Sequence, residues 1–174
     1  MNLITDINPG TPEEINVIIE IGKGSKNKYE VDEQTGLMAL DRTMFTAENY
    51  PYDYGFIPQT LWDDNDPLDV IVLTTNPLES GILVRVRPVA MMEMVDEGKS
   101  DVKIITVPIS DPRWDKVRDL ENIDGQVLKE MRHFYSTYKI SQNKEVIVGN
   151  FDGKNKAIEA FLKAVELYKK HKKD

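Results

Sequence analysis

The sequence predicts an α+β fold in which short strands close into a small barrel and two helices pack outside it. Up to residue 107, segments rich in β-branched and apolar residues alternate with Gly, Pro, Asn and Asp. Beyond Pro112 the apolar residues recur at helical spacing instead. No internal repeat, linker or low-complexity stretch interrupts the 174 residues, so we expect one domain, residues 1–174.

The expected strands are separated by turn-forming residues, and they cover residues 15–21, 28–33, 37–42, 68–74, 82–95 and 102–107. Pro88 should bend or bulge the long 82–95 strand, because proline cannot donate a hydrogen bond within a ladder. A further short extended piece is expected at residues 145–148. The aromatic segment Tyr50–Gly55 reads as a turn, since Pro, Asp and Gly punctuate it.

Two amphipathic helices follow the strands. In the first helix, the apolar residues that follow helical spacing are Val127, Leu128, Met131, Phe134, Tyr135 and Tyr138. Asp124 is its expected N-cap. The second helix carries Ile158, Phe161, Leu162, Val165 and Tyr168 on one face, and Asp152 is the expected cap. Its basic end, residues 169–173, suits the negative end of a helix dipole.

Composition excludes several classes of protein. Apolar residues make up 40% of the chain and charged residues 30%, as in an ordinary globular domain, and no apolar run approaches a membrane span of ~20 residues. The segment Met1–Asp6 lacks the features of a secretory signal, and without cysteine there is no disulfide framework. We therefore expect a cytoplasmic protein. The net charge of −8 argues against a nucleic-acid partner.

The most informative segment is the acidic run at residues 63–70, Asp-Asp-Asn-Asp-Pro-Leu-Asp-Val, directly before an apolar strand. Crowded carboxylates repel one another and resist desolvation, so a positive partner is needed. Oxygen ligands alone favour a hard cation such as Mg²⁺ or Mn²⁺. A solvated acidic turn is the alternative, but Asp69 falls inside the apolar pattern and Pro67 stiffens the link. An EF-hand is excluded, because Asp69 stands where that loop needs Gly.

Other catalytic schemes find no support. Residues 22–26, Gly-Lys-Gly-Ser-Lys, lack the spacing of a P-loop, and no G-x-S-x-G elbow or cysteine nucleophile exists. The two histidines are too few for a zinc protease, and His133 beside Phe134 is expected at the surface or in an interface.

Charged and aromatic residues recur at the ends of the other predicted elements. They are Glu20, Lys28, Tyr29, Glu30, Asp41, Arg42, Tyr50 to Gly55, Arg87, Asp96, Asp101, Lys103, His133, Tyr138 and Lys139. Each has a plain structural alternative, such as a same-face ion pair between Lys28 and Glu30. Their order along the chain is more specific than any one of them.

Taken together, these segments resemble the soluble family I inorganic pyrophosphatases of the prokaryotic type. The signature Asp-x-Asp-Pro-x-Asp is met by Asp64, Asp66, Pro67 and Asp69, and the flanking motifs extend the likeness over roughly residues 10 to 170. The resemblance implies a five-stranded barrel of OB type, a single catalytic domain, and Mg²⁺-dependent hydrolysis of pyrophosphate to two phosphates without a covalent intermediate.

The resemblance also implies a role for each site residue. Asp66 would be the general base that acts on a metal-activated water. The expected metal ligands are Asp64, Asp69, Asp101, Asp96, Glu20 and Glu30, the two glutamates acting through metal-bound waters or an ion carried by the substrate. The phosphate oxygens would be gripped by Lys28, Arg42, Tyr54, Lys103, Tyr138 and Lys139.

Charge counting agrees with this assignment. Seven acids against four basic side chains leave the expected site at −3, and pyrophosphate adds about three negative charges, so about three divalent cations would neutralise the assembly. We expect three to four Mg²⁺ ions with substrate bound, with Mn²⁺ as a substitute, because bound cations also lower the pKa of water.

Two rival classes stay open at this point. A phosphatase with an aspartyl nucleophile also uses Asp-x-Asp with Mg²⁺, but there the motif follows a strand, whereas here the strand follows the motif. A metal- or oligonucleotide-binding barrel would explain the fold but not the acids. The resemblance further implies a homohexamer; the methionines at 91, 92 and 94 could lie in such a contact, although a place in the core fits them better.

Overall fold

The computed structural model describes residues 1–172. Its strands are β1 (Ile15–Ile21), β2 (Asn27–Val31), β3 (Met38–Thr43), β4 (Asp53–Phe56), β5 (Asp69–Val72), β6 (Leu83–Asp96), β7 (Lys99–Ser100), β8 (Lys103–Pro108) and β9 (Val146–Gly153). The helices are α1 (Gly125–Thr137) and α2 (Lys154–His171), with short 3₁₀ helices η1 (Pro112–Trp114), η2 (Leu120–Asn122) and η3 (Ile140–Gln142).

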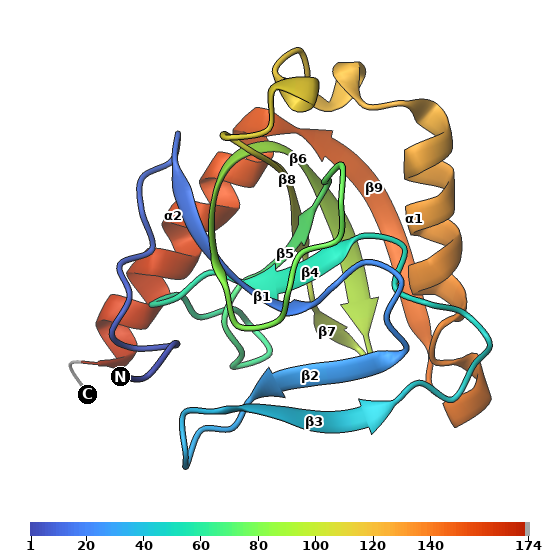
Figure 1. Ribbon diagram of the computed structural model, residues 1–174, viewed down its shortest axis with the longest axis horizontal. Coiled ribbons are helices and arrows are strands. Elements are labelled where there is room, and N and C mark those ends of the chain that lie inside the picture. Colours follow the sequence, from blue (N-terminus) through green and yellow to red (C-terminus); the bar gives the residue numbers. More distant parts are fainter. Residues whose placement is uncertain (173–174) are drawn as a thin grey trace.

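Five strands close into a ring in the order β1-β4-β5-β8-β6, and β6 returns to pair with β1. The β5–β8 pair is parallel and the other pairs of the ring are antiparallel. Figure 1 shows this barrel between α1 and α2, with the separate β2–β3 hairpin across one end. The predicted α+β fold with a five-stranded, OB-like barrel is confirmed.

Strand β4 corrects the prediction of a turn at residues 50–55. Asp53–Phe56 is buried throughout and pairs with both β1 and β5. Gly55 makes the close approach to β1 feasible, because a Cβ at this position would lie 1.9 Å from the Ile18 carbonyl oxygen. The Tyr and Pro residues before it form the turn, and the chain becomes a central strand only through its two neighbours.

The barrel is packed on two sides. One apolar cluster joins residues of β1, β5 and β6 to Ala157, Ala160, Phe161 and Ala164 of α2. A second joins residues of β5, β6 and β8 to Met131, Phe134 and Tyr135 of α1. The methionines at 91, 92 and 94 are buried in these clusters, which confirms the core placement rather than an exposed contact.

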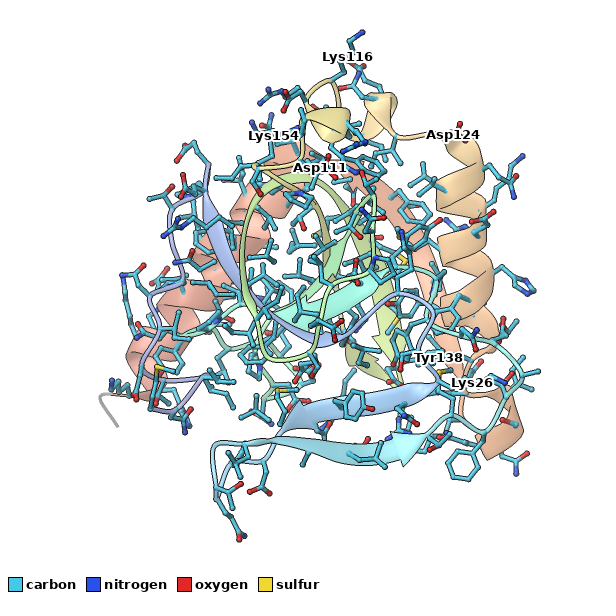
Figure 2. All side chains as sticks on the ribbon, in the orientation of Figure 1. Lys26, Asp111, Lys116, Asp124, Tyr138 and Lys154 are labelled. Atoms are coloured by element: carbon cyan, nitrogen blue, oxygen red, sulfur yellow. The ribbon has the colours of Figure 1, made fainter. Side chains whose placement is uncertain are left out.

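The helix ends agree with the sequence at α1 and differ at α2. Asp124 accepts a hydrogen bond from Gln126 N at 2.7 Å, as predicted for an N-cap, and Tyr138 caps the other end of α1 (Figure 2). The prediction of Asp152 as the cap of α2 is wrong, because Asp152 lies in β9 and Gly153 is the N-cap. Asp119 accepts from Lys154 N instead. Basic residues do occupy the last turn of α2, and Lys173 falls outside the described residues.

Pro88 lies at a register shift between β6 and β8, as predicted. The segment 111–124 contains η1 and η2. The Arg87 guanidinium links it to the barrel by donating to the Val117 carbonyl at 3.1 Å. Within residues 1–172, no helix has the length and apolar character needed to cross a membrane.

Candidate active site

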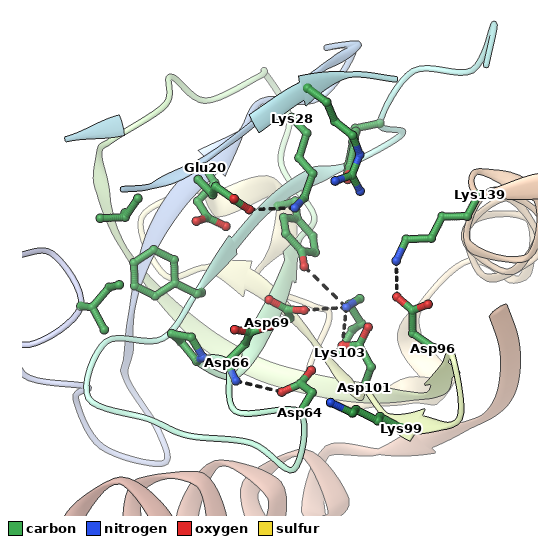
Figure 3. A pocket seen from close by; sticks show the side chains of 18 of the residues that line it. Glu20, Lys28, Asp64, Asp66, Asp69, Asp96, Lys99, Asp101, Lys103 and Lys139 are labelled. Atoms are coloured by element: carbon green, nitrogen blue, oxygen red, sulfur yellow. Dashed lines mark hydrogen bonds and ion pairs between the residues drawn. The ribbon is translucent and has the colours of Figure 1, made fainter. Parts of the chain in front are cut away.

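A cavity of about 800 Å³ collects every residue that the sequence places in the candidate site. Its lining includes Glu20, Lys28, Glu30, Arg42, Tyr54, Asp64, Asp66, Asp69, Asp96, Asp101, Lys103, Tyr138 and Lys139. These side chains come from the barrel strands, the loop before β5, the link between β7 and β8, the β2–β3 hairpin and the segment after α1, and they converge in Figure 3. The structure thus brings the predicted residues together, while their individual chemical roles stay predictions.

The parallel pairing of β5 with β8 creates the centre of the cavity. Asp69 begins β5 and lies opposite Lys103, the first residue of β8. Asp101 precedes Lys103 by two residues and extends to the same side, where its carboxylate contacts the Lys103 ammonium. Two segments that are distant in sequence therefore present their acids side by side at one edge of the barrel.

Lys103 is the charged group that holds this centre together. Its buried ammonium donates to Asp69 Oδ2 at 2.6 Å and to Asp101 Oδ1 at 2.7 Å, with the Tyr54 hydroxyl at 3.5 Å (Figure 3). Burial disfavours the ionised lysine, but the two carboxylates outweigh it and raise the pKa of Lys103 well above its usual value. The Lys103 ammonium therefore carries its charge although it is buried.

The hairpin brings a second charged network to the cavity. Lys28 Nζ contacts Glu30 Oε2 at 2.8 Å, which confirms the predicted same-face ion pair, and it also contacts Asp41 Oδ2 at 3.1 Å. Arg42 Nη1 lies 2.6 Å from the same Asp41 oxygen. Lys28 lies opposite Arg42 in the β2–β3 ladder, so both cationic groups belong to one rigid element.

A third network lies on the side of α1. Lys139, just after the helix, forms an ion pair with Asp96 at the end of β6 (Figure 3). The Lys139 ammonium lies 5.5 Å from the centroid of the Tyr138 ring, and burial raises the pKa of Tyr138 above its usual value. Burial likewise raises the pKa of Tyr54. Both phenols therefore keep their protons and can donate hydrogen bonds.

Several acids of the cavity resist ionisation. Desolvation, with the Asp69 carboxylate adding to it, raises the pKa of Glu20 to about 8. Desolvation also raises the pKa of Asp101 to about 6, against the opposing influence of Lys103. The pKa values of Asp64 and Asp66 are raised as well, by desolvation and by the neighbouring acids. The cavity is short of positive charge.

The donor set fits hard divalent cations. Carboxylate oxygens dominate it, and Asp96 Oδ1 is buried without a hydrogen-bond partner among residues 1–172. In the same part of the chain, no three acidic or histidine side chains form a ready-made ion site, and the Lys103 ammonium lies between Asp69 and Asp101. Cations that entered here would supply the missing positive charge, and the carboxylates would reorient toward them.

Sequence reasoning missed both charged and aromatic residues of the lining, and the charged ones are Asp32, Glu33, Glu97 and Lys99. Tyr50 and Tyr135 also line the cavity, and the Tyr50 ring lies 5.0 Å from that of Phe134. Asp41 was seen only as part of a motif, although it bridges Lys28 and Arg42. The alternation of Lys28 and Glu30 could not reveal this bridge, because the register of the hairpin decides it. His133 is 74% exposed and does not line the cavity, as expected of a surface residue.

Comparisons with known proteins agree on one family. The family model of inorganic pyrophosphatase matches residues 17–169. Soluble inorganic pyrophosphatase 1 of Arabidopsis thaliana is 42% identical over 163 residues, which are 94% of this chain and 77% of that protein. The crystal structure of inorganic pyrophosphatase from Thermus thermophilus superimposes with a TM-score of 0.93 at 40% identity, covering 97% of this chain and 99% of that one.

The inorganic pyrophosphatase from Helicobacter pylori gives a TM-score of 0.90 at 37% identity, with 94% of this chain and 99% of that one covered. The family model spans nearly the whole chain, and the likeness in sequence and in structure extends over the same residues that build the barrel and the cavity. The chain therefore belongs to the inorganic pyrophosphatase family.

Proposed function

We propose that this enzyme hydrolyses inorganic pyrophosphate to two phosphates with Mg²⁺, through direct attack of water and with Asp66 as the general base. The observation that carries the proposal is the composition of one cavity, in which the six carboxylates expected to bind metal lie together with a set of lysine, arginine and tyrosine donors. A compact polyanion accompanied by several divalent cations complements both halves of such a lining. Membership of the family supports the same reaction.

The carboxylates divide by position. Asp64, Asp69 and Asp101 would hold the tightest cation, with Asp69 also reaching a second, while Asp96 and Asp101 would serve a third. Glu20 and Glu30 would act through metal-bound waters or through an ion carried by the substrate. When bound, the cations neutralise these acids and lower the pKa of water towards neutrality. Three to four Mg²⁺ ions, replaceable by Mn²⁺, fit the charge of the site together with its substrate.

The basic and phenolic side chains would orient the substrate. Arg42 and Lys28 approach from the hairpin, and Lys139 approaches from the opposite side of the cavity. Tyr54 and Tyr138 keep their protons and so can donate to phosphate oxygens, and Lys103 adds a fixed charge in the barrel. Phosphoryl transfer needs mainly such positioning and electrostatic stabilisation.

Asp66 is the acid best placed to accept a proton. Its side chain is exposed to the cavity, and the loop that carries it is fixed by the Asp66 N–H, which donates to Asp64 Oδ1 at 3.1 Å. Desolvation and the Asp64 carboxylate raise the pKa of Asp66, which makes it a stronger base than an ordinary aspartate. One Asp64 oxygen is thereby bonded within the loop, while both carboxylates line the cavity.

The rival enzyme class is a phosphatase with an aspartyl nucleophile. The test is an acid quench of the enzyme during turnover of ³²P-labelled pyrophosphate, together with phosphate release from pyrophosphate and from p-nitrophenyl phosphate. We expect release from pyrophosphate, little from the ester, and no label on the quenched protein. Acid-stable label on the protein, or preferred hydrolysis of the ester, would overturn the proposal in favour of the rival.

We also infer a homohexamer and a cytoplasmic location, both from the family resemblance and the composition. Sedimentation equilibrium of the purified protein tests the first: a mass of a single chain at micromolar concentration would contradict it. Pyrophosphate, phosphate and further copies of this chain are then its partners, and neither nucleic acid nor a membrane is among them.

A further inference from the structure

The acidic loop that carries Asp64 and Asp66 rests on α2. The Leu61 N–H donates to the Ala164 carbonyl in the middle of the helix at 3.0 Å. The next residue, Trp62, is only 8% exposed and packs in the same apolar cluster as Ala160 and Phe161. Helix α2, on the outside of the barrel, thus supports the loop whose carboxylates face the cavity.

Trp62 is bonded to both acid-bearing segments. Its backbone N–H donates to the Asp66 carbonyl at 2.8 Å, which closes the acidic loop upon itself. Its indole Nε1–H donates to the Ser100 hydroxyl at 3.2 Å. Ser100 immediately precedes Asp101, so one side chain connects the loop of Asp64 and Asp66 with the segment that supplies Asp101.

Lys163 of α2 contacts the ring of Trp62. Its ammonium lies 4.1 Å from the centroid of the Trp62 ring, within range of a cation–π interaction. The same ammonium pairs with Asp63 at 3.0 Å. Lys163 therefore contacts two consecutive residues of the loop, directly before Asp64, and none of the three lines the cavity.

We propose that Trp62 and Lys163 are positioning residues that set the spacing between the carboxylates of the acidic loop and Asp101. This inference rests on the proposed function, because it assigns these carboxylates to the cations. A cation bound by carboxylates of two loops binds tightly only if the two loops keep a fixed relative position. Residues that contact metal ligands from outside the site commonly control metal affinity in this way. The Trp62–Ser100 hydrogen bond is the direct tie between the two loops.

The test is a double-mutant cycle on that hydrogen bond. Trp62→Phe keeps an aromatic ring but removes the donor, and Ser100→Ala removes the acceptor. Mg²⁺ affinity of the metal-free proteins is measured by isothermal titration calorimetry, and unfolding by urea in excess chelator. We expect each single variant to bind Mg²⁺ about 3- to 10-fold more weakly, and the double variant no more weakly than the worse single.

A second comparison isolates Lys163. Lys163→Ala should weaken Mg²⁺ binding about 2- to 3-fold, because a half-exposed cation–π contact and ion pair are lost. Lys170→Ala on the same helix is the matched control, since Lys170 forms an exposed ion pair at 2.8 Å with Glu166 of the helix itself rather than with the loop. The control should bind Mg²⁺ like the wild type.

A merely structural role would lower stability against urea while leaving Mg²⁺ affinity unchanged. That result in both Trp62→Phe and Ser100→Ala would overturn the proposal, as would additive losses in the double variant. Saturating Mg²⁺ should restore kcat with pyrophosphate in these variants, because Asp66 and the phosphate-binding side chains are intact. Calorimetry does not depend on turnover, so failure of this inference is separable from failure of wild-type protein to hydrolyse pyrophosphate.

Discussion

At the scale of single residues, burial and neighbouring charge give chemically similar acids different environments. Glu20 lies in the barrel wall, where desolvation raises its pKa to about 8. Asp69 contacts the buried Lys103 ammonium, whereas Asp66 faces the cavity without such an ion pair in the structure of residues 1–172. A cation would therefore replace or join Lys103 at Asp69, and Asp66 stays available for a proton.

Replacing Asp66 and Asp69 in turn tests the proposal that the first is a general base and the second a metal ligand. Asp69→Asn should weaken Mg²⁺ binding, with activity partly restored at high Mg²⁺ concentration. Asp66→Asn should bind Mg²⁺ nearly normally but lose up to ~10²-fold in kcat, less than the full effect of a base because the cations already acidify water. Raising the pH should help Asp66→Asn more than the wild type.

Calorimetric titration with Mg²⁺ and pH–rate profiles on both variants decide the matter. If Mg²⁺ rescues Asp66→Asn and leaves Asp69→Asn inactive, the two roles must be exchanged.

Arg42→Lys tests the contact between the hairpin and the substrate. A guanidinium can make two parallel hydrogen bonds to a phosphate, which an ammonium cannot reproduce. We expect kcat/KM for pyrophosphate to fall about 10- to 100-fold while Mg²⁺ affinity and the circular dichroism spectrum are preserved. Steady-state phosphate release measures the loss, and activity within about 2-fold of wild type would remove Arg42 from the substrate-binding set.

At the scale of elements, the sequence predicts the features that depend on local residue patterns. It misses those that depend on pairing between distant segments. Asp124 caps α1 as expected, because the cap, the helix and the apolar face are all local. Strand β4 was missed because Tyr-Pro-Tyr-Asp-Tyr-Gly has the residues of a turn, and only pairing with β1 and β5 makes its end a strand. Asp119 at the start of α2 is likewise a contact between distant segments.

The candidate site was predictable to a greater extent than the elements that carry it. The acids and their spacing are a chemical signature, and the structure places all of them around one cavity. The bridge from Asp41 to Lys28 and Arg42 depends on hairpin register, and the contact of Trp62 with Lys163 depends on how α2 packs. No local pattern encodes either of them.

Gly55→Ala tests the close approach of β4 and β1. The added Cβ would lie 1.9 Å from the Ile18 carbonyl oxygen, so one strand must move. We expect the free energy of unfolding to fall by about 3 kcal/mol, measured by urea denaturation. Gly125→Ala is the matched control, since a Cβ there meets nothing within 4 Å and alanine favours the first turn of α1. Equal stability of the two variants would contradict the packing described for the barrel.

At the scale of the whole molecule, the barrel concentrates negative charge that the folded protein alone does not neutralise. The pKa of Glu20 is raised from 4.5 to about 8 and that of Asp101 from 3.8 to about 6. Between its unfolded and folded pKa values, each of these acids keeps a proton in the folded, metal-free protein that the unfolded chain has released. Because the folded state binds more protons there, the free energy of unfolding must fall as pH rises through this range.

We therefore expect metal-free protein to lose about 3 kcal/mol of stability between pH 5 and pH 8, as measured by urea denaturation in chelator. Mg²⁺ should flatten this trend, because bound cations favour the ionised acids. Glu20→Gln removes the acid with the larger of these two pKa shifts. The stability of its metal-free form should therefore depend less steeply on pH. A stability that rises with pH in chelator would contradict the charge state assigned to the cavity.

We propose that the carboxylate cavity hydrolyses pyrophosphate only when divalent cations occupy it. The most direct test is the initial rate of phosphate release from pyrophosphate as free Mg²⁺ is raised from excess chelator, with a parallel series in Ca²⁺. We predict no release in chelator and a rise steeper than first order in Mg²⁺. Ca²⁺ should support the reaction poorly, because a larger ion of looser geometry misplaces the reacting groups. Full activity in chelator, or equal rates with Ca²⁺ and Mg²⁺, would contradict the account.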